Sequence, residues 1–547
     1  MKKHILPYLY LFLSLLLALG LIQLHRFWKI KKPTEVFIPR KNGQDTLVFL
    51  SGPDKKILFP YEATYDEEIF LMNQIYQGLV KLDHQMREVP DLARYWEISP
   101  DFKTYTFYLP RGHTFHNGQP LTADDVEMSL QYYLRHYQKN YLFPYFLVIK
   151  GARAYAAGKT DQLPGVEKVS PYIIRFHLEK PFLPFLKLLS VAEAKILPGG
   201  LLRTNPNYLK THPIGSGPYM VKHFSDSTIF MEAAHWHAKS QSPPFVRFLK
   251  IVYGKEVSMK RLHRFRFHLT NYFYLVSEQG RREFNELRLS TLTTIFLGLN
   301  CQQFPTNRVS FRKALLYAIP RKKITEKYAE QLAPANYFCP LNLPRDTAHV
   351  QLPEVDFAKA RSWMETFRKQ SGADSMPTVR LAIDTTLYSP DFLQLITESL
   401  ERLEVPYQVV YYQGLSWKEE VAFLKKFHMF LLGWTLDLPD PQFYFDIFFN
   451  SQQVNNIMQY RNPNVDLLLR LANETFQIKK RLKYYVQIEE ILRKEVPIIP
   501  IQENYENIFY KKYVKNILMN QIGISSLDLS QLWMDINLRR QIENQVK

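Results

Sequence analysis

The sequence predicts an α/β protein of several structural units, and three observations lead to this prediction. The chain has 547 residues, and at roughly 150 residues per domain this length corresponds to about three to four units. Hydrophobic residues make up 46% and charged residues 22% of the chain, which is typical of a globular protein and excludes wholesale disorder. From Thr46 onward, short runs that resemble β-strands alternate with amphipathic helical stretches, as α/β architectures require.

Alternating or continuous apolar runs indicate strands at residues 104–109, 172–178, 229–232, 245–252, 294–299, 429–434 and 497–501. Amphipathic spacing indicates helices from 122 toward 136 and at 310–318, 356–369, 390–403, 465–472 and 479–493. At the first helix, we expect Thr122 to be the N-cap and Asp125 to complete a variant capping box. No low-complexity linker separates the elements, so we expect the chain to cross between its units more than once.

The amino terminus contains an uncharged stretch at residues 5–22, preceded by a basic start. This pattern is typical of a secretory signal peptide or of a short membrane anchor, and we assign it residues 1–25. The basic cluster at residues 26–32 opposes export, and a buried core helix is the remaining alternative. We nevertheless expect export to the periplasm, with a tether to the inner membrane if the segment is not cleaved.

Charge and cysteine content exclude several classes of protein. The formal net charge is +18, but the first 41 residues hold a surplus of seven positive charges, and no long basic run follows. We therefore expect no nucleic-acid partner. Cys301 and Cys339 are too few for a disulfide scaffold or a four-thiolate zinc site, and the sequence leaves open whether they pair with each other.

No motif indicates catalysis. The chain lacks His-Glu-x-x-His and a Gly-Lys-Ser/Thr phosphate loop, and Ser216 lacks the spacing of a nucleophile elbow. His113 with His116 and His235 with His237 have no acidic or cysteine ligand nearby, so we interpret them as ordinary surface or turn histidines. We therefore expect no enzymatic activity, no metal and no cofactor.

The most informative acidic segment is Trp434–Pro441, which follows the predicted strand 429–434. Asp437 and Asp440 alternate with prolines there, at the carboxyl end of a strand, where open α/β sheets bind ligands. A carboxylate held in this position can receive a ligand ammonium through a charge-assisted hydrogen bond. A rigid turn with two solvated aspartates is the alternative, and residue chemistry alone leaves the two interpretations even.

Six blocks of sequence occur in an order that resembles a known family. They are VPDLARYWEISPDFKTYTFYLPRGHTFHNGQPLTADDVEMSLQYYL at 89–134, GSGPYMV at 215–221, LGLN at 297–300, FRKALLYAI at 311–319, LGWTLDLPDP at 432–441 and NPNVDLLLRLA at 462–472. This order is similar to that of the family 5 extracellular solute-binding proteins, the periplasmic dipeptide- and oligopeptide-binding components of ABC importers.

The resemblance implies a fold like that of the periplasmic binding proteins of class II. Two α/β lobes would close around a ligand, and the first lobe would carry an extra subdomain. The expected divisions are 45–78 for the first segment of lobe I, 79–195 for the extra subdomain, 196–295 for the continuation of lobe I, 296–498 for lobe II and 499–537 for the carboxy-terminal return to lobe I.

The resemblance also implies a site. Asp437 would bind the α-ammonium of a peptide, and Trp434 would form a wall of the pocket. Further ligand-binding residues would be Thr435, Tyr65, Tyr388 and Trp417. Residues 430–432 are apolar, whereas some oligopeptide-binding relatives carry a basic residue there for the peptide carboxylate. Recognition of the carboxyl end of the ligand therefore stays open.

The function that follows is capture without catalysis. We expect a monomer that traps a peptide by hinged closure of its lobes and delivers it to an ABC permease in the inner membrane. The alternatives are a binding protein of the same fold for a non-peptide solute, such as a metal chelate, haem or an oligosaccharide, and an exported hydrolase.

Overall fold

The computed structural model describes most of the chain from Thr46 onward. The described residues are 46–51, 58–225, 227–234, 244–253, 267–271, 283–326, 332–340, 343, 351–372, 376–385 and 390–545. They belong to one compact unit, Thr46–Lys547. The apolar amino-terminal segment lies outside these residues, as do Tyr388 and the pair His235 and His237. Within the described ranges, no helix combines the length and apolar character needed to cross a membrane.

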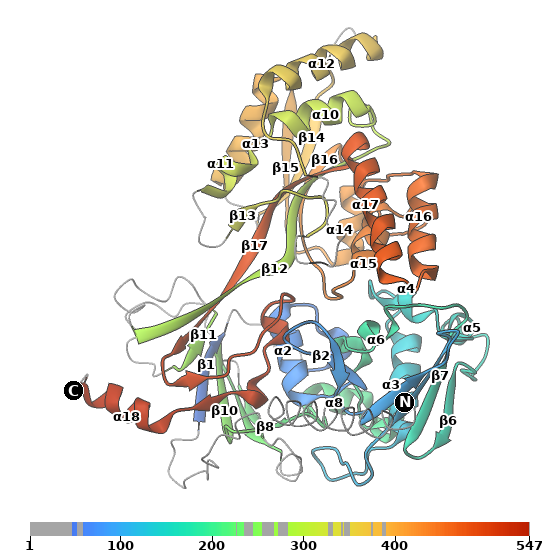
Figure 1. Ribbon diagram of the computed structural model, residues 1–547, viewed down its shortest axis with the longest axis vertical. Helices are drawn as coiled ribbons and strands as arrows, with labels where there is room; N and C mark the ends of the chain where they lie inside the picture. Colours follow the sequence, from blue (N-terminus) through green and yellow to red (C-terminus); the bar gives the residue numbers. More distant parts are fainter. Residues whose placement is uncertain are drawn as a thin grey trace, which may run out of the picture. The chain divides into compact units, whose positions relative to one another are not determined.

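The described residues form an eleven-stranded sheet that extends through the unit (Figure 1). In order across the sheet, its strands are β15 Tyr407–Tyr412, β14 Val379–Asp384, β16 Met429–Thr435, β12 Phe284–Leu299, β17 Ile498–Lys511, β11 Leu269–Thr270, β1 Thr46–Ser51, β10 Phe248–Tyr253, β9 Thr228–Ala233 and β8 Tyr219–Phe224, with β13 Leu332–Pro334 paired to β17 outside this order. Strand β1, the first described strand, and β17, near the carboxyl end, therefore share a sheet with strands from the middle of the chain.

Strands β12 and β17 connect the two halves of this sheet (Figure 1). They pair with each other in antiparallel fashion, and β16 pairs with the far end of β12. The ladder between β12 and β17 shifts register between Ser290 and Thr294, so this part of β12 is irregular. There, the N–H of Leu292 donates to the carbonyl of Gln521 at 2.8 Å. The sequence predicted only residues 294–299 and 497–501 as strand, so both predicted strands were too short.

Three smaller sheets accompany the large one: a four-stranded sheet of β4 Tyr95–Ile98, β5 Thr104–Tyr108, β7 Ile173–His177 and β6 Val166–Ser170, and two-stranded sheets of β2 Val80–Leu82 with β3 Glu88–Pro90 and of β18 Val514–Lys515 with β19 Trp533–Met534. The predicted strands at 104–109 and 172–178 are neighbours in the first of them. The short 3₁₀ helices are η1 Pro60–Glu62, η2 Ala192–Ala194, η6 Ile524–Ser526 and η7 Leu529–Gln531.

The α-helices are α2 Asp66–Ile75, α3 Ala123–His136, α4 Phe143–Phe146, α5 Ala152–Ala156, α6 Phe185–Leu188, α7 Gly199–Thr204, α8 Pro206–Thr211, α10 Val309–Ala318, α11 Arg321–Glu326, α12 Phe357–Ser371, α13 Pro390–Arg402, α14 Trp417–Leu424, α15 Pro441–Phe449, α16 Pro463–Glu474, α17 Ile478–Glu495 and α18 Ile536–Gln545. Helix α3 begins as predicted, with a capping box between Thr122 and Asp125. Asp125 also accepts a hydrogen bond from the N–H of Gly199 at 2.9 Å.

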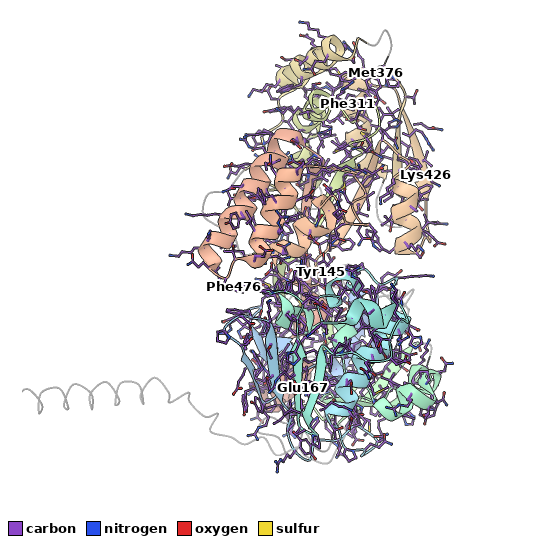
Figure 2. All side chains as sticks on the ribbon, turned by 90° about the vertical axis from the view of Figure 1, so that its right-hand side faces the viewer. Tyr145, Glu167, Phe311, Met376, Lys426 and Phe476 are labelled. Atoms are coloured by element: carbon purple, nitrogen blue, oxygen red, sulfur yellow. The ribbon has the colours of Figure 1, made fainter. Side chains whose placement is uncertain are left out.

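A hydrophobic core continues from the large sheet into α15, all nine residues of which are buried. Tyr145 of α4, labelled in Figure 2, packs against Phe443 of α15 with ring centroids 4.6 Å apart. Its hydroxyl donates to Asp446 at 3.0 Å. These contacts hold α15, and therefore the end of β16 before it, next to the segment that contains α4. Cys301 and Cys339 do not form a disulfide with each other.

Candidate ligand-binding site

A cavity of about 580 Å³ lies beside the carboxyl end of β16. Segments far apart in the sequence line it: the lining residues come from 63–74, 81–91, 140–141, 190–195, 433–437 and 520–528, together with Pro218 and Trp417. Its volume is within the range of pockets that bind small molecules, roughly 300–1,000 Å³. The cavity is therefore large enough for a small ligand.

Five of the six side chains predicted to bind ligand line this one cavity: Tyr65, Trp417, Trp434, Thr435 and Asp437. Tyr388, the sixth, lies outside the described residues. The structure thus brings the five residues together although more than 370 positions separate the first from the last in the sequence. Their part in binding a ligand stays a prediction.

The backbone on both sides of Asp437 is fixed. Thr435 is the last residue of β16 and pairs with Thr293 of β12, with the two hydroxyl oxygens 2.9 Å apart. The N–H of the next residue, Leu436, donates to the carbonyl of Leu292 at 3.2 Å. Both leucines that flank Asp437 are buried. Because its neighbours are anchored in this way, the Asp437 side chain is held at the cavity wall.

The Asp437 carboxylate has a neutral partner and no cationic one among the described residues. The hydroxyl of Tyr141 donates a hydrogen bond to its Oδ2. Burial raises the pKa of Asp437 to about 7, because a charged carboxylate is poorly solvated there. A ligand that brings a positive charge would compensate this group.

Asp440, three residues further on, has a different role. It is 4% exposed and accepts hydrogen bonds from both terminal nitrogens of Arg481, at 2.6 and 2.8 Å. It also caps α15 by accepting from the N–H of Gln442 at 2.9 Å. Burial alone would raise the pKa of Asp440, but the Arg481 guanidinium holds it below its usual value. Asp440 is therefore a structural group, and the interpretation of a turn with two solvated aspartates is wrong.

Aromatic rings form the wall beside Asp437. The ring of Trp434 lies 4.9 Å from that of Trp417 and 5.3 Å from that of Tyr141, in the latter case edge to face at 87°. Trp417 is held in turn by a hydrogen bond from its Nε1 to Asn455 Oδ1 at 3.1 Å. Such rigid, flat side chains provide apolar contact area at low entropic cost.

Sequence reasoning missed a second carboxylate, Asp66, which begins α2 and also lines the cavity. Burial raises the pKa of Asp66 well above its usual value, and the charges of Asp437 and Glu506 add to this effect. No donor or cation contacts its side chain within the described part of the chain. The cavity near Asp437 therefore holds two carboxyl groups whose ionised forms a cationic ligand group would stabilise.

The acidic run at the start of α2 could have suggested this position. Adjacent acids at a helix start commonly cap the helix, and Glu68 does so: its Oε2 accepts from the N–H groups of Thr64 and Tyr65, at 2.8 and 3.2 Å. Asp66, in the same run, faces the cavity instead.

Sequence reasoning also missed two lysines in the cavity wall. Lys81 forms an ion pair with Asp528 at 3.0 Å, and Lys195 is 2% exposed. No sequence motif marks either residue, since both depend on contacts between distant segments. The histidines of the 113–116 pair make ordinary contacts: His113 to Gln77 at 2.9 Å and His116 to Gly217 at 3.1 Å.

Comparison with curated proteins finds relatives that match more than four fifths of the chain. The dipeptide-binding protein of Escherichia coli K12 is 26% identical over 499 residues, which cover 85% of this chain and 90% of that protein. Heme-binding protein A of Haemophilus influenzae is also 26% identical, over 472 residues that cover 82% and 85% of the two chains.

Comparison with solved structures identifies the same fold. The crystal structure of Haemophilus influenzae OppA in complex with the peptide RPPGFSPFR matches with a TM-score of 0.73 and 21% identity, and covers 90% of this chain and 100% of that one. At this level of identity the match establishes the fold alone, and it confirms the prediction of a periplasmic-binding-protein-like α/β fold. The family described as bacterial extracellular solute-binding proteins, family 5 Middle, matches residues 87–456. The chain therefore belongs to the family 5 bacterial extracellular solute-binding proteins.

Proposed function

We propose that this protein captures peptides outside the cytoplasm and delivers them to an ABC permease in the inner membrane, without catalysing a reaction on them. The peptide would lie in the cavity beside β16 with its α-ammonium on Asp437. One observation supports this proposal most strongly. Asp437 is held at the wall of a ligand-sized cavity by the last pairs of β16, and no cation neutralises it among the described residues.

The neighbouring groups support an elongated ligand with a positive end. Asp66 adds a second carboxyl group close to Asp437. The ammonium of a peptide would stabilise the ionised form of these groups, so it would bind there more favourably than a neutral group. The rings of Trp434 and Trp417 offer apolar surface for the peptide beyond its first residue. Water in the remaining volume would allow different side chains. One similar protein is named as a dipeptide-binding protein, and one similar structure is a complex with the peptide RPPGFSPFR. Both are consistent with a site that binds a peptide.

Closure around the ligand would use β12 and β17. These strands connect the halves of the large sheet, and the irregular ladder near Leu292 offers a place where they can bend while few backbone pairs are lost. The domain divisions predicted from the sequence, with lobe II at 296–498, place this bend next to a lobe boundary. The energy for closure would come from contacts that the peptide makes only in the closed state. We expect the protein to act as a monomer.

Haem is the second candidate solute, because a relative of similar identity is a heme-binding protein. The aromatic wall would also suit a flat ring system. Haem has no ammonium group, however, so it would not pair with the Asp437 carboxylate. Peptide capture therefore accounts for more of the site.

The proposal is tested by incubating the purified full-length protein with an equimolar library of tetrapeptides and recording native mass spectra of the complexes. We expect peptides with a free amine to be retained, and the same library with acetylated amines to be retained at least tenfold less. Haem, added in a parallel sample, is detected by its visible absorption. Retention of haem with no peptide in either library would overturn the proposal, as would turnover of retained peptides into fragments.

A further inference from the structure

We propose that Lys195 binds a carboxylate of the captured solute, so that the cavity recognises a zwitterion with its ammonium on Asp437 and its carboxylate on Lys195. This inference rests on the proposed function and adds the second recognition point. It also defines the class of solute: a molecule with one positive and one negative group, such as a peptide with both termini free.

The backbone of Lys195 is rigidly held. Lys195 follows the short helix η2, and its N–H donates to the carbonyl of Ala192 at 3.1 Å. Its own carbonyl accepts a hydrogen bond from the hydroxyl of Tyr61 at 3.3 Å. The N–H of the following residue, Ile196, donates to the carbonyl of Gln77 at 2.9 Å. The position from which the lysine side chain extends is therefore fixed before any ligand arrives.

The side chain is buried but uncompensated. Lys195 is 2% exposed and lines the cavity. Across the described ranges, no acceptor forms a hydrogen bond with its ammonium and no carboxylate lies within 4.0 Å of it. Burial lowers the pKa of Lys195, and Lys81 lowers it further, while the charge of Asp91 acts in the opposite direction. An isolated charge in such a position costs stability, which a ligand anion would recover.

Asp91, the carboxylate whose charge raises the pKa of Lys195, makes its hydrogen bonds to other groups. The carboxylate of Asp91 accepts hydrogen bonds from the N–H of Gly78 at 2.9 Å and from Gln77 Nε2 at 3.2 Å. The other lysine of the cavity, Lys81, already has its partner in Asp528. Lys195 is thus the one lysine of the described cavity wall that lacks an ion pair.

The negative and positive groups belong to one cavity. Asp437 lines it just after the end of β16, and Lys195 lines it just after η2. Because both side chains border the same cavity, a single ligand can contact both of them.

The chemistry favours a carboxylate over a group of higher charge. A lysine ammonium is a single point charge with three donors, which matches one carboxylate. Acidic side chains in the cavity wall outnumber the two lysines: they are Asp66, Asp91, Glu193, Asp437 and Asp528. A dianion such as phosphate would bring a second negative charge that no unpaired lysine of the described cavity wall compensates, whereas a carboxylate on a ligand that also carries an ammonium would not add net charge.

The test uses two tetrapeptide libraries with free amines, one of free acids and one of carboxy-terminal amides, competing for the full-length protein in native mass spectrometry. For the parent protein, we expect free acids to be retained roughly 30-fold or more over amides, the scale for losing one partner of a buried charged hydrogen bond. In Lys195→Met, acids and amides should be retained within about twofold of each other. Lys168→Met removes the same charge outside the cavity, where Lys168 pairs with Asp124 at 2.6 Å, and should behave as the parent.

The amide library also distinguishes the source of the carboxylate. If amides that contain glutamate are retained over those with glutamine, and Lys195→Met abolishes this difference, the lysine binds a side-chain carboxylate of the ligand. Thermal unfolding checks the fold of the variant: without its uncompensated charge, ligand-free Lys195→Met should melt no lower than the parent. The parent's own preference for acids is a test that does not depend on any variant.

Two results overturn the inference while the proposed function stands: equal retention of acids and amides by the parent, or a preference for acids that persists in Lys195→Met. If the parent retains no peptide from either library, the proposed function fails and the inference fails with it.

Discussion

Asp437 determines how the affinity for a ligand should depend on pH. Its pKa is raised to about 7 in the ligand-free protein, and only the ionised carboxylate can pair with an ammonium. Below pH 7 the ligand must therefore displace a proton, and the affinity is expected to fall by about tenfold for each pH unit. Calorimetry with a retained peptide between pH 5.5 and pH 8 measures this slope.

The control for this prediction is the same peptide with an acetylated amine, which should show little dependence on pH over the range. An affinity of the free-amine peptide that is constant from pH 5.5 to pH 8 would show that the Asp437 carboxylate does not carry the ligand's positive charge.

Single residues also show what sequence could and could not predict. Asp437 could be singled out because it follows a buried strand, where this kind of sheet binds ligands. That local property left a solvated turn equally open, and the resemblance to the family favoured ligand binding. Tyr141 and Lys195 could not be singled out, because nothing in their own segments indicates a site. They line the cavity only because 140–141 and 190–195 fold next to the end of β16.

Helix α15 and the loop before it depend on the pair of Asp440 and Arg481. Asp440→Ala would leave a buried guanidinium uncompensated and remove the N-cap of α15. We expect the free energy of unfolding to fall by about 3–5 kcal/mol, measured by urea denaturation.

Asp161→Ala is the matched control, because Asp161 pairs with Arg135 at the surface with its side chain fully exposed, and such pairs are worth about 1 kcal/mol or less. A loss below 1 kcal/mol for Asp440→Ala would contradict the structural role assigned to the buried pair.

Helices were easier to predict than the long strands. The capping box at Thr122 and the periodic apolar positions of α3 are local signals, and the structure confirms them. Strand β17 was recognised only at residues 497–501, because Gln502–Glu506 is a polar run that hides the alternation. These residues lie where β17 passes from one half of the sheet to the other, and two of them, Gln502 and Glu503, are buried where they pair with β12.

At the scale of the whole molecule, the fold class followed from the alternation of elements and from the order of the six sequence blocks. The cavity did not follow, because its walls come from segments at both ends and in the middle of the chain. The predicted domain divisions stay predictions. A domain boundary depends on which parts move together, and the pairing of β12 with β17 joins both halves in one continuous sheet.

The most direct test of peptide capture is a cycle of four affinities measured by calorimetry. The parent and Asp437→Asn are each titrated with one retained tetrapeptide, in free-amine and in acetylated form. Asparagine preserves the size of the side chain and can still accept a hydrogen bond from Tyr141. We predict that the substitution weakens binding of the free-amine peptide by about 2–4 kcal/mol and leaves the acetylated peptide unchanged. Equal affinity of both proteins for the free-amine peptide would contradict the central claim that Asp437 holds the ligand's positive end.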